Sequence, residues 1–183
     1  MNTCYTYHKE VAMKQGDILQ KHIDNGVQIV DIAHTYIEEN VQIEEGTVLY
    51  PNVSIRGNTY IGKNNVIDMN TIIIDSKIGH DNVVVQSVIE GCEIGNNNQI
   101  GPFAHLRPNT YIGDHNQIGN FVEVKSTVIK DENYIKHLSY LGDATLESQI
   151  NVGAGAVIAN YNAKTKVKSK AQLQQGACIE VGS

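Results

Sequence analysis

Aliphatic residues recur along the chain at intervals of six, with an occasional five, between Ile37 and Ile158. A helix has a period of 3.6 residues and a simple strand a period of two, so neither structure repeats at six. A hexapeptide period instead predicts a parallel β-helix, in which six residues form one short strand and one corner. The repeating positions are Ile37, Ile43, Leu49, Ile55, Ile61, Ile67, Ile73, Ile78, Val84, Ile89, Ile94, Ile100, Leu106, Ile112, Ile118, Val124, Ile129, Ile135, Leu141, Leu146, Val152 and Ile158.

The period divides the chain into two parts. Residues 1–26 lack it, are rich in helix formers and end at Asn25-Gly26, which predicts a short N-terminal lead-in helix. Residues 27–183 are predicted to form the β-helix, with about seven coils of three hexapeptides each. The five-residue intervals predict tightened corners that shift the register without losing it.

The hexapeptide period fails after Ile158, and residues 160–170 contain four lysines. This pattern indicates a loop that projects from the coil, either as a binding element or as a solvated connection. A coil-like segment follows from Gly176 to Ser183. A solenoid needs a polar cap over its last open edge, and the sequence shows no candidate for one. We therefore expect an incomplete array, or one whose end is covered by a partner.

The composition suits left-handed corners and argues against nucleic-acid-binding and membrane-spanning proteins. Sixteen glycines and nineteen asparagines suit left-handed turns, and Asn96–Asn98 is predicted to serve as turn residues. The net charge of −6 gives no basic footprint for nucleic acid, and no apolar run is long enough to span a bilayer. The start of the chain does not form a secretory signal. Three cysteines without CxxC spacing indicate a reducing cytoplasm.

Two cations lie one coil apart. Arg107 follows the core position Leu106, and Lys125 follows Val124 eighteen residues later. Because one coil is about eighteen residues long, we expect the two side chains to stack on the same face. Stacked cations without an acid between them indicate an anion site, such as one for a phosphate. A pair of ordinary surface charges is the alternative.

His137 and Tyr140 lie close together in the sequence, near the next core positions. A histidine can act as a general base near neutral pH, and a tyrosine can hydrogen-bond a ligand, although a lone histidine more often has a structural role. The other histidines in the coil, His80, His105 and His115, lack the close spacing of metal ligands. We predict no metal site in this domain.

Four blocks of sequence around these residues resemble a known family. They are Gly101–Pro108, Ile118–Lys125, His137–Ala144, and Asn151–Gly155 with Asn160-Tyr161. In order and spacing they are similar to the C-terminal half of the bifunctional N-acetylglucosamine-1-phosphate uridyltransferase and glucosamine-1-phosphate N-acetyltransferase family. The resemblance implies a left-handed all-β parallel β-helix that forms a homotrimer, with acetyl-transfer sites between neighbouring chains.

The same resemblance implies acetyl-CoA-dependent N-acetylation of glucosamine-1-phosphate, a step toward UDP-N-acetylglucosamine and peptidoglycan, with acetyl-CoA as a co-substrate. His137 resembles the general base. The residues that resemble the sugar-phosphate site are Arg107, Lys125, Tyr140, Asn151 and Lys166. The residues that resemble acetyl-CoA contacts are Ala154, Asn160, Tyr161 and Ser183.

The chain departs from the family in three places. The uridyltransferase half and its glycine-rich loop are absent, so uridylyl transfer is not predicted. The family continues beyond Ser183 through coils that complete the acetyl-CoA cleft, and Lys136 replaces a small residue or proline before the histidine. These departures affect the binding of acetyl-CoA more than that of the sugar phosphate. The alternative function is therefore a non-catalytic trimeric relative that binds a sugar phosphate or regulates assembly.

Overall fold

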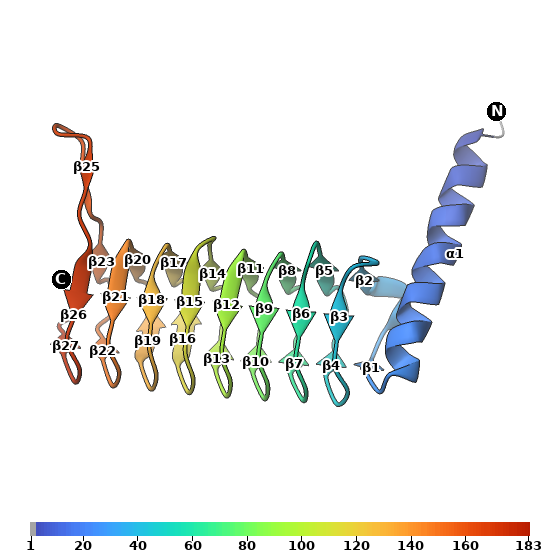
Figure 1. Cartoon of the computed structure of the whole chain (residues 1–183), viewed down its shortest axis with the longest axis horizontal. Coiled ribbons are helices and arrows are strands. Elements are labelled where there is room, and N and C mark those ends of the chain that lie inside the picture. Colours follow the sequence, from blue (N-terminus) through green and yellow to red (C-terminus); the bar gives the residue numbers. More distant parts are fainter. Residues whose placement is uncertain (1–2) are drawn as a thin grey trace.

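The computed structural model describes residues 3–183, and side chains from residue 14 onward. The chain begins with one helix, α1 (Thr3–Asp24), and continues as a left-handed parallel β-helix that extends away from it (Figure 1). A short 3₁₀ turn, η1 (Ile32–His34), lies in the first coil. The predicted fold class is therefore confirmed.

Three parallel sheets form the faces of the coil. The first face contains β1 (Gln28–Ile29), β4 (Val48–Leu49), β7 (Val66–Ile67), β10 (Val83–Val84), β13 (Gln99–Ile100), β16 (Gln117–Asn120), β19 (Tyr134–His137), β22 (Asn151–Val152) and β27 (Cys178–Ile179). The second contains β2 (Tyr36–Ile37), β5 (Ser54–Arg56), β8 (Ile72–Ile74), β11 (Val88–Glu90), β14 (His105–Leu106), β17 (Glu123–Lys125), β20 (Tyr140–Gly142) and β23 (Val157–Ile158). The third contains β3 (Gln42–Ile43), β6 (Tyr60–Ile61), β9 (Lys77–Ile78), β12 (Cys92–Ile94), β15 (Thr110–Ile112), β18 (Val128–Ile129), β21 (Ala144–Leu146) and β26 (Ala171–Leu173).

These sheets give about eight turns, one more than the predicted seven. The coil already begins at Gln28, before the first counted aliphatic position, and the five-residue intervals shorten several coils. The aliphatic period itself is confirmed as the core, because every repeating position except Ile158 is buried. Ile158 is half-buried and packs against the same core.

Helix α1 ends at Asp24, two residues before Gly26. Gly26 has a φ of +87°, a conformation that glycine adopts without strain, and its N–H donates to the Ile23 carbonyl. Leu19 is buried against the first coil. His22 is also buried, and no partner for its Nδ1 is found among the described residues. Ile18 also packs against this core, and the Gln15 Nε2 donates to the Ile37 carbonyl at 3.2 Å, so both apolar and polar contacts hold the helix to the coil.

The buried His22 predicts that stability falls on acidification. Burial lowers the pKa of His22 below its ordinary value of 6.5, and the nearby Lys21 lowers it further. The unfolded chain therefore binds more protons than the folded chain as the pH falls through 6.5, so the free energy of unfolding decreases. We expect the difference in unfolding midpoint between pH 7.5 and pH 5.5, measured by urea titration, to become smaller in His22→Leu. An unchanged difference would contradict this assignment.

A column of five buried asparagines runs inside the corner between the third and first faces. This asparagine ladder consists of Asn65, Asn82, Asn98, Asn116 and Asn133. Each Oδ1 accepts the backbone N–H of the next asparagine at 2.8–2.9 Å, and the last accepts the N–H of Ile150 at 2.8 Å. The side chains thereby satisfy donors that the short strands leave unpaired.

The ladder corrects the prediction that Asn96–Asn98 serves only as turn residues. Asn97 is a turn residue with a φ of +56°. Asn98 is buried in the ladder, where its Nδ2 donates to the Gly113 carbonyl at 2.9 Å. The Oδ1 of Asn96 accepts the N–H of His80 in the preceding coil. Two of the three asparagines therefore bond adjacent coils together.

Residues after β23 leave the coil as a two-stranded antiparallel arm, β24 (Tyr161–Asn162) and β25 (Val167–Lys168). The arm extends beyond the outline of the coil (Figure 1). An ion pair of 3.1 Å between Lys168 and Asp143 anchors its base. The coil resumes at Ala171, which pairs with Ala144, and not at Gly176 as the sequence suggested. The strand β26 is too short to show an aliphatic period by itself.

Candidate functional site

Arg107 and Lys125 lie in successive coils on the second face. Leu106 pairs with Val124, and the backbone N–H of Arg107 donates to the Val124 carbonyl at 2.8 Å. Each cation follows an inward core residue, so both side chains point outward from adjacent coils, and both are half-buried. The structure thus places the two cations one above the other, as the coil length requires.

The two cations are not equally free. The Nη1 of Arg107 donates to the Oε1 of Glu123 at 2.7 Å, which corrects the expectation of two cations without an intervening acid. No acidic partner for Lys125 is found among the described residues. Because Glu123 offsets one positive charge, Lys125 is the cation of this pair that can attract an anion most directly. An anion that binds Arg107 competes with Glu123 or shares the guanidinium with it.

Tyr140 lies one coil after Lys125, on the next strand of the second face. It begins β20, in which Gly142 pairs with Lys125 of the coil before. A Cβ atom on Gly142 would lie 2.6 Å from the Tyr140 hydroxyl, so the ring occupies the space that a side chain would fill. Glycine at 142 therefore allows the phenol to lie on the outer surface, one strand from Lys125.

His137 ends β19 at the corner between the first and second faces, and its side chain is exposed. It pairs with Asn120 of the preceding coil. Beside it runs a shallow groove of about 170 Å³. The groove is lined by Gln99, Gly101, Gln117, Ile118, Gly119, Asn120, Lys136 and His137. The Lys136 ammonium lies 5.2 Å from the centre of the Tyr134 ring. The imidazole is thus accessible to a ligand, in a groove with neutral amides and one cation.

The remaining predicted sugar-phosphate residues lie elsewhere. Asn151 is exposed on the first face, where it pairs with Tyr134, so the corner separates it from Lys125 and Tyr140. Lys166 lies between the two strands of the arm and is exposed. One chain therefore does not bring the five predicted residues together.

The predicted acetyl-CoA residues lie around the last coil and the base of the arm. The Ala154 carbonyl accepts the N–H of Gly182, and the Ser183 carbonyl accepts the N–H of Val157. The Asn160 Nδ2 donates to the carbonyls of Gly142 and Asp143, at 2.8 and 3.0 Å. The side-chain nitrogen of Asn160 thus holds the arm, and the side-chain Oδ1 is left for a ligand.

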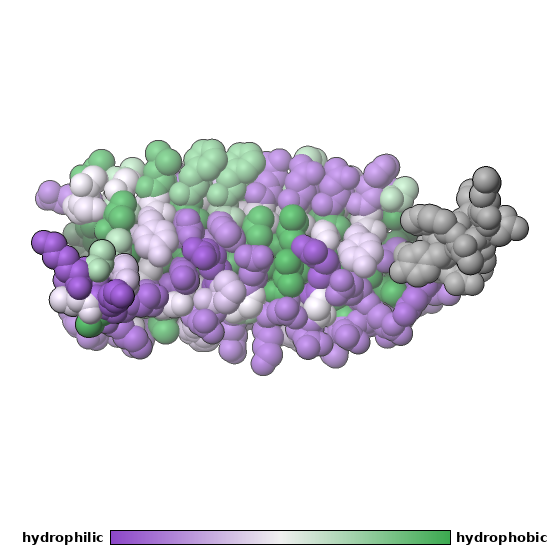
Figure 2. Space-filling view, turned by 90° about the horizontal axis from the view of Figure 1, so that it is seen from above, coloured by the Kyte–Doolittle hydropathy of each residue, from purple (hydrophilic) through white to green (hydrophobic). Residues whose placement is uncertain are grey.

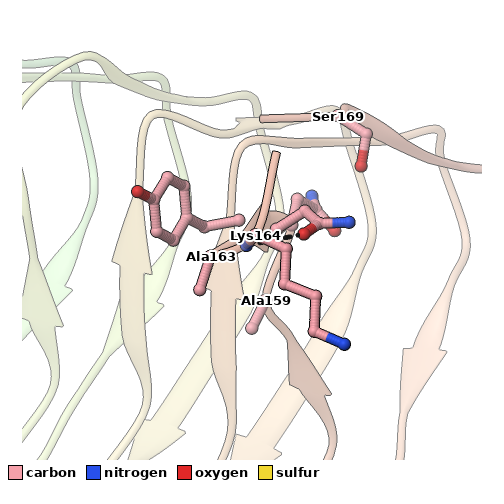
Figure 3. A pocket seen from close by; sticks show the side chains of 7 residues that line it. Ala159, Ala163, Lys164 and Ser169 are labelled. Carbon is pink, nitrogen blue, oxygen red and sulfur yellow. Dashed lines mark hydrogen bonds between the residues drawn. The ribbon is translucent and has the colours of Figure 1, made fainter. Parts of the chain in front are cut away.

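An open hollow of about 620 Å³ lies beside the arm. Ala159, Ala163 and Lys164 lie around it, with Ser169 on the segment that returns from the arm to the coil (Figure 3). Asn160 and Tyr161 also contribute to its lining. Small side chains leave room for a ligand here, and Lys164 supplies a positive charge.

Across the described residues, no three His, Cys, Asp or Glu side chains cluster closely enough to hold a metal ion. Within the same part of the chain, no helix combines the length and apolar character needed to cross a bilayer.

Glu123 and Gly142 are site residues that the sequence reasoning missed. The sequence does contain a signal for Glu123. It lies two residues before Lys125 on the same strand, so both side chains share the outward face. Its diagonal contact with Arg107 follows from the pairing of Glu123 with His105. No sequence signal separates Gly142 from the corner glycines, since its role depends on the rotamer of Tyr140.

Comparison with known proteins supports the fold and identifies the family. Residues 91–126 match the family model "Bacterial transferase hexapeptide (six repeats)". The chain is 46% identical to the bifunctional protein GlmU of Clostridium beijerinckii over 148 residues, which are 81% of this chain and 32% of that protein. It is 42% identical to GlmU of Bacillus velezensis over 174 residues, which are 95% of this chain and 38% of that protein.

The chain thus spans about a third of the length of these relatives. Among solved structures, LpxA from Acinetobacter baumannii matches with a TM-score of 0.55 and 18% identity, over 84% of this chain and 67% of that one. This likeness shows the fold alone. The resemblance recognised from the four sequence blocks is confirmed: the chain is a hexapeptide-repeat β-helix of the GlmU family, corresponding to its acetyltransferase half.

Proposed function

We propose that the chain transfers the acetyl group of acetyl-CoA to the amine of glucosamine-1-phosphate, as a step of cell-envelope precursor synthesis in the cytoplasm. The observation that carries the proposal is the position of His137. It is an exposed imidazole at the corner that joins the face of Lys125 and Tyr140 to the face of Asn151. This arrangement provides a base between two sets of groups that suit a phosphorylated sugar.

The chemistry requires a proton acceptor. The amine of the sugar is an ammonium near neutral pH, so the His137 imidazole first removes a proton from it. The neutral amine attacks the thioester carbonyl, the C–N bond forms and the C–S bond breaks. Coenzyme A leaves as the thiolate and accepts the second proton of the amine. Lys125 offsets the charge of the phosphate, and the Tyr140 hydroxyl hydrogen-bonds the sugar.

The proposed site is completed by a neighbouring chain. Lys125 and Tyr140 lie on the second face, Asn151 lies on the first, and Lys166 is on an arm that extends beyond the coil (Figure 1). A homotrimer supplies these groups from different copies, because the first face of one copy can lie opposite the second face of the next. The arm then reaches a copy other than its own.

The test is a turnover assay with the purified chain, acetyl-CoA and glucosamine-1-phosphate. Because Cys178 is an exposed thiol, the readout is the acetylated sugar phosphate measured by mass spectrometry, not thiol titration. We expect product to form, and Lys125→Ala to raise the KM for the sugar phosphate. Lys130→Ala is the matched control, since Lys130 lies on the third face and is paired with Glu147.

One result would overturn the proposal, and another would change the role assigned to Lys125. Absence of product with a trimeric protein would exclude the acetyltransferase activity of this chain. If glucosamine-1-phosphate still bound in calorimetry, and Lys125→Ala abolished that binding, the non-catalytic alternative would stand in its place. An equal rise in KM in Lys130→Ala would show that the effect of Lys125 is general electrostatics, not a contact in the site.

A further inference from the structure

Asp143 lies where the second face, the arm and the returning coil meet. It occupies the corner between the second and third faces with a φ of +51°, which aspartate tolerates better than bulkier residues do. Its backbone N–H donates to the Lys125 carbonyl at 3.1 Å, and its own carbonyl accepts the Ala171 N–H at 3.2 Å. One residue thus joins the strand of Lys125 to the strand on which the chain re-enters the coil.

Both sides of the base of the arm are attached to this residue. On the outgoing side, the Asn160 Nδ2 donates to the Asp143 carbonyl at 3.0 Å. On the returning side, the Lys168 Nζ lies 3.1 and 3.5 Å from the two carboxylate oxygens of Asp143. Ser169 closes the base, because its N–H donates to the Asn160 carbonyl at 3.0 Å. The arm is therefore held to the coil by one amide and one ion pair at the same corner.

The rest of the arm has no packing that could fix its direction. Every residue from 161 to 170 is exposed, and strongly hydrophilic side chains gather at the end of the coil where the arm projects (Figure 2). Four of these residues are lysines, and among the described residues only Lys168 has an acidic partner. The carboxylate of that pair is 23% exposed and the ammonium 51%, so the pair is partly shielded from water. The direction of the arm thus depends on the polar contacts at its base.

We propose that Asp143 is a positioning residue: through its ion pair with Lys168 it fixes the direction of the arm and, with it, the place that Lys166 reaches. Lys166 precedes Lys168 by two residues, about 7 Å of extended chain, so holding one limits the range of the other. The inference rests on the proposed function, in which Lys166 binds the sugar phosphate. A lysine held in place before the ligand arrives loses less entropy on binding, so the ligand binds more tightly.

The first test measures the arm without substrate. Trypsin cleaves after lysine, so the rate at which fragments ending at Lys164 and Lys166 appear in mass spectrometry reports how often the arm is released. Asp143→Asn retains the shape of the side chain and tolerates the positive φ but removes the charge. We expect cleavage to rise roughly two- to fivefold, the range for loss of a partly exposed ion pair, with little change in the urea midpoint. Lys168→Met should produce the same rise.

Asp75→Asn is the matched control. Asp75 occupies the same corner in an earlier coil with a φ of +47°, and its carboxylate accepts the Asn58 backbone N–H instead of a lysine. Its cleavage rate should equal that of the wild type. Salt provides a second check, because screening weakens ion pairs: the ratio of cleavage between Asp143→Asn and the wild type should fall toward one between about 0.05 and 0.5 M NaCl. The response of trypsin itself to salt cancels in this ratio.

The second test asks whether Asp143 acts through Lys166. Asp143→Asn is expected to raise the KM for glucosamine-1-phosphate roughly two- to fivefold with little change in kcat, since binding is weakened and the chemical step is not. In a chain that carries Lys166→Ala, the same substitution should add nothing, because the residue that it positions is gone. Lys170→Met, which removes an exposed lysine from the same arm, is the control and should leave the KM unchanged.

Three results would overturn this role of Asp143. They are cleavage of Asp143→Asn at the wild-type rate, a cleavage ratio that does not change with salt, and an equal rise in KM with and without Lys166. The proposed activity fails separately. A chain that forms no product refutes acetyl transfer; the dissociation constant from calorimetry then replaces KM, and the trypsin assay, which contains no substrate, still decides whether Asp143 anchors the arm.

Discussion

Replacing His137 by asparagine is expected to lower the kcat for acetyl transfer by roughly 10²- to 10⁴-fold, the usual contribution of a positioned general base. Asparagine retains a polar side chain of similar size but cannot accept a proton near neutral pH. Because His137 is exposed and not part of the core, folding should be unaffected. Binding of glucosamine-1-phosphate, measured by calorimetry, should change little, so the loss appears in kcat and not in KM.

His115→Asn is the control for this variant. His115 is also an exposed histidine, but it lies on a different corner with a φ of +57°, which asparagine tolerates. We expect its kcat to equal that of the wild type. Unaltered turnover in His137→Asn would remove the histidine from the mechanism, and an equal loss in both variants would indicate a defect in folding or assembly.

Asn98→Leu is expected to destabilise the chain by roughly 3 to 5 kcal/mol, since each buried polar group left unpaired costs about 1–3 kcal/mol. The substitution removes the acceptor for the Asn116 backbone N–H at 2.8 Å and for its Nδ2 at 3.1 Å. It also removes the donor to Gly113. Leucine has the same number and branching of side-chain heavy atoms, so the substitution opens no cavity and the loss reflects hydrogen bonding. Urea unfolding followed by circular dichroism measures it.

Asn58→Leu provides the comparison for the ladder variant. Asn58 is exposed, and only its backbone N–H forms a hydrogen bond with Asp75. The same substitution there should change the free energy of unfolding by less than about 0.5 kcal/mol. Equal midpoints for the two variants would show that the asparagine ladder contributes little to stability.

The architecture could be predicted from sequence because it depends on one strong signal. Each coil requires a buried aliphatic residue in each of its hexapeptides. The aliphatic period is therefore repeated many times, and a single irregular interval does not hide it. The asparagine ladder could not be recognised in this way. Asparagine suits both a left-handed corner and a buried ladder, and neighbours such as Asn97 and Asn98 differ only in the direction of the side chain.

The candidate site was predictable only in part. The coil length placed Arg107 above Lys125, because that relation depends on the backbone alone. The pairing of Arg107 with Glu123 depends on the rotamers of long side chains on neighbouring strands, which coil length does not determine. The separation of Asn151 from Lys125 depends on the corner at His137, which the linear spacing of the residues does not show.

The register of the coil has a consequence for how such a chain can change in length. Ile37, Ile55 and Ile73 occupy the same position in successive coils. Removing residues 56–73 would therefore join Ile55 to Ile74 and preserve the alternation of inward and outward side chains. Helix α1 would move toward the site by one strand spacing, about 4.8 Å, while the site kept its own neighbours. Length and chemistry are thus separable properties of this molecule, and whole coils can be lost or duplicated without altering the residues that bind a substrate.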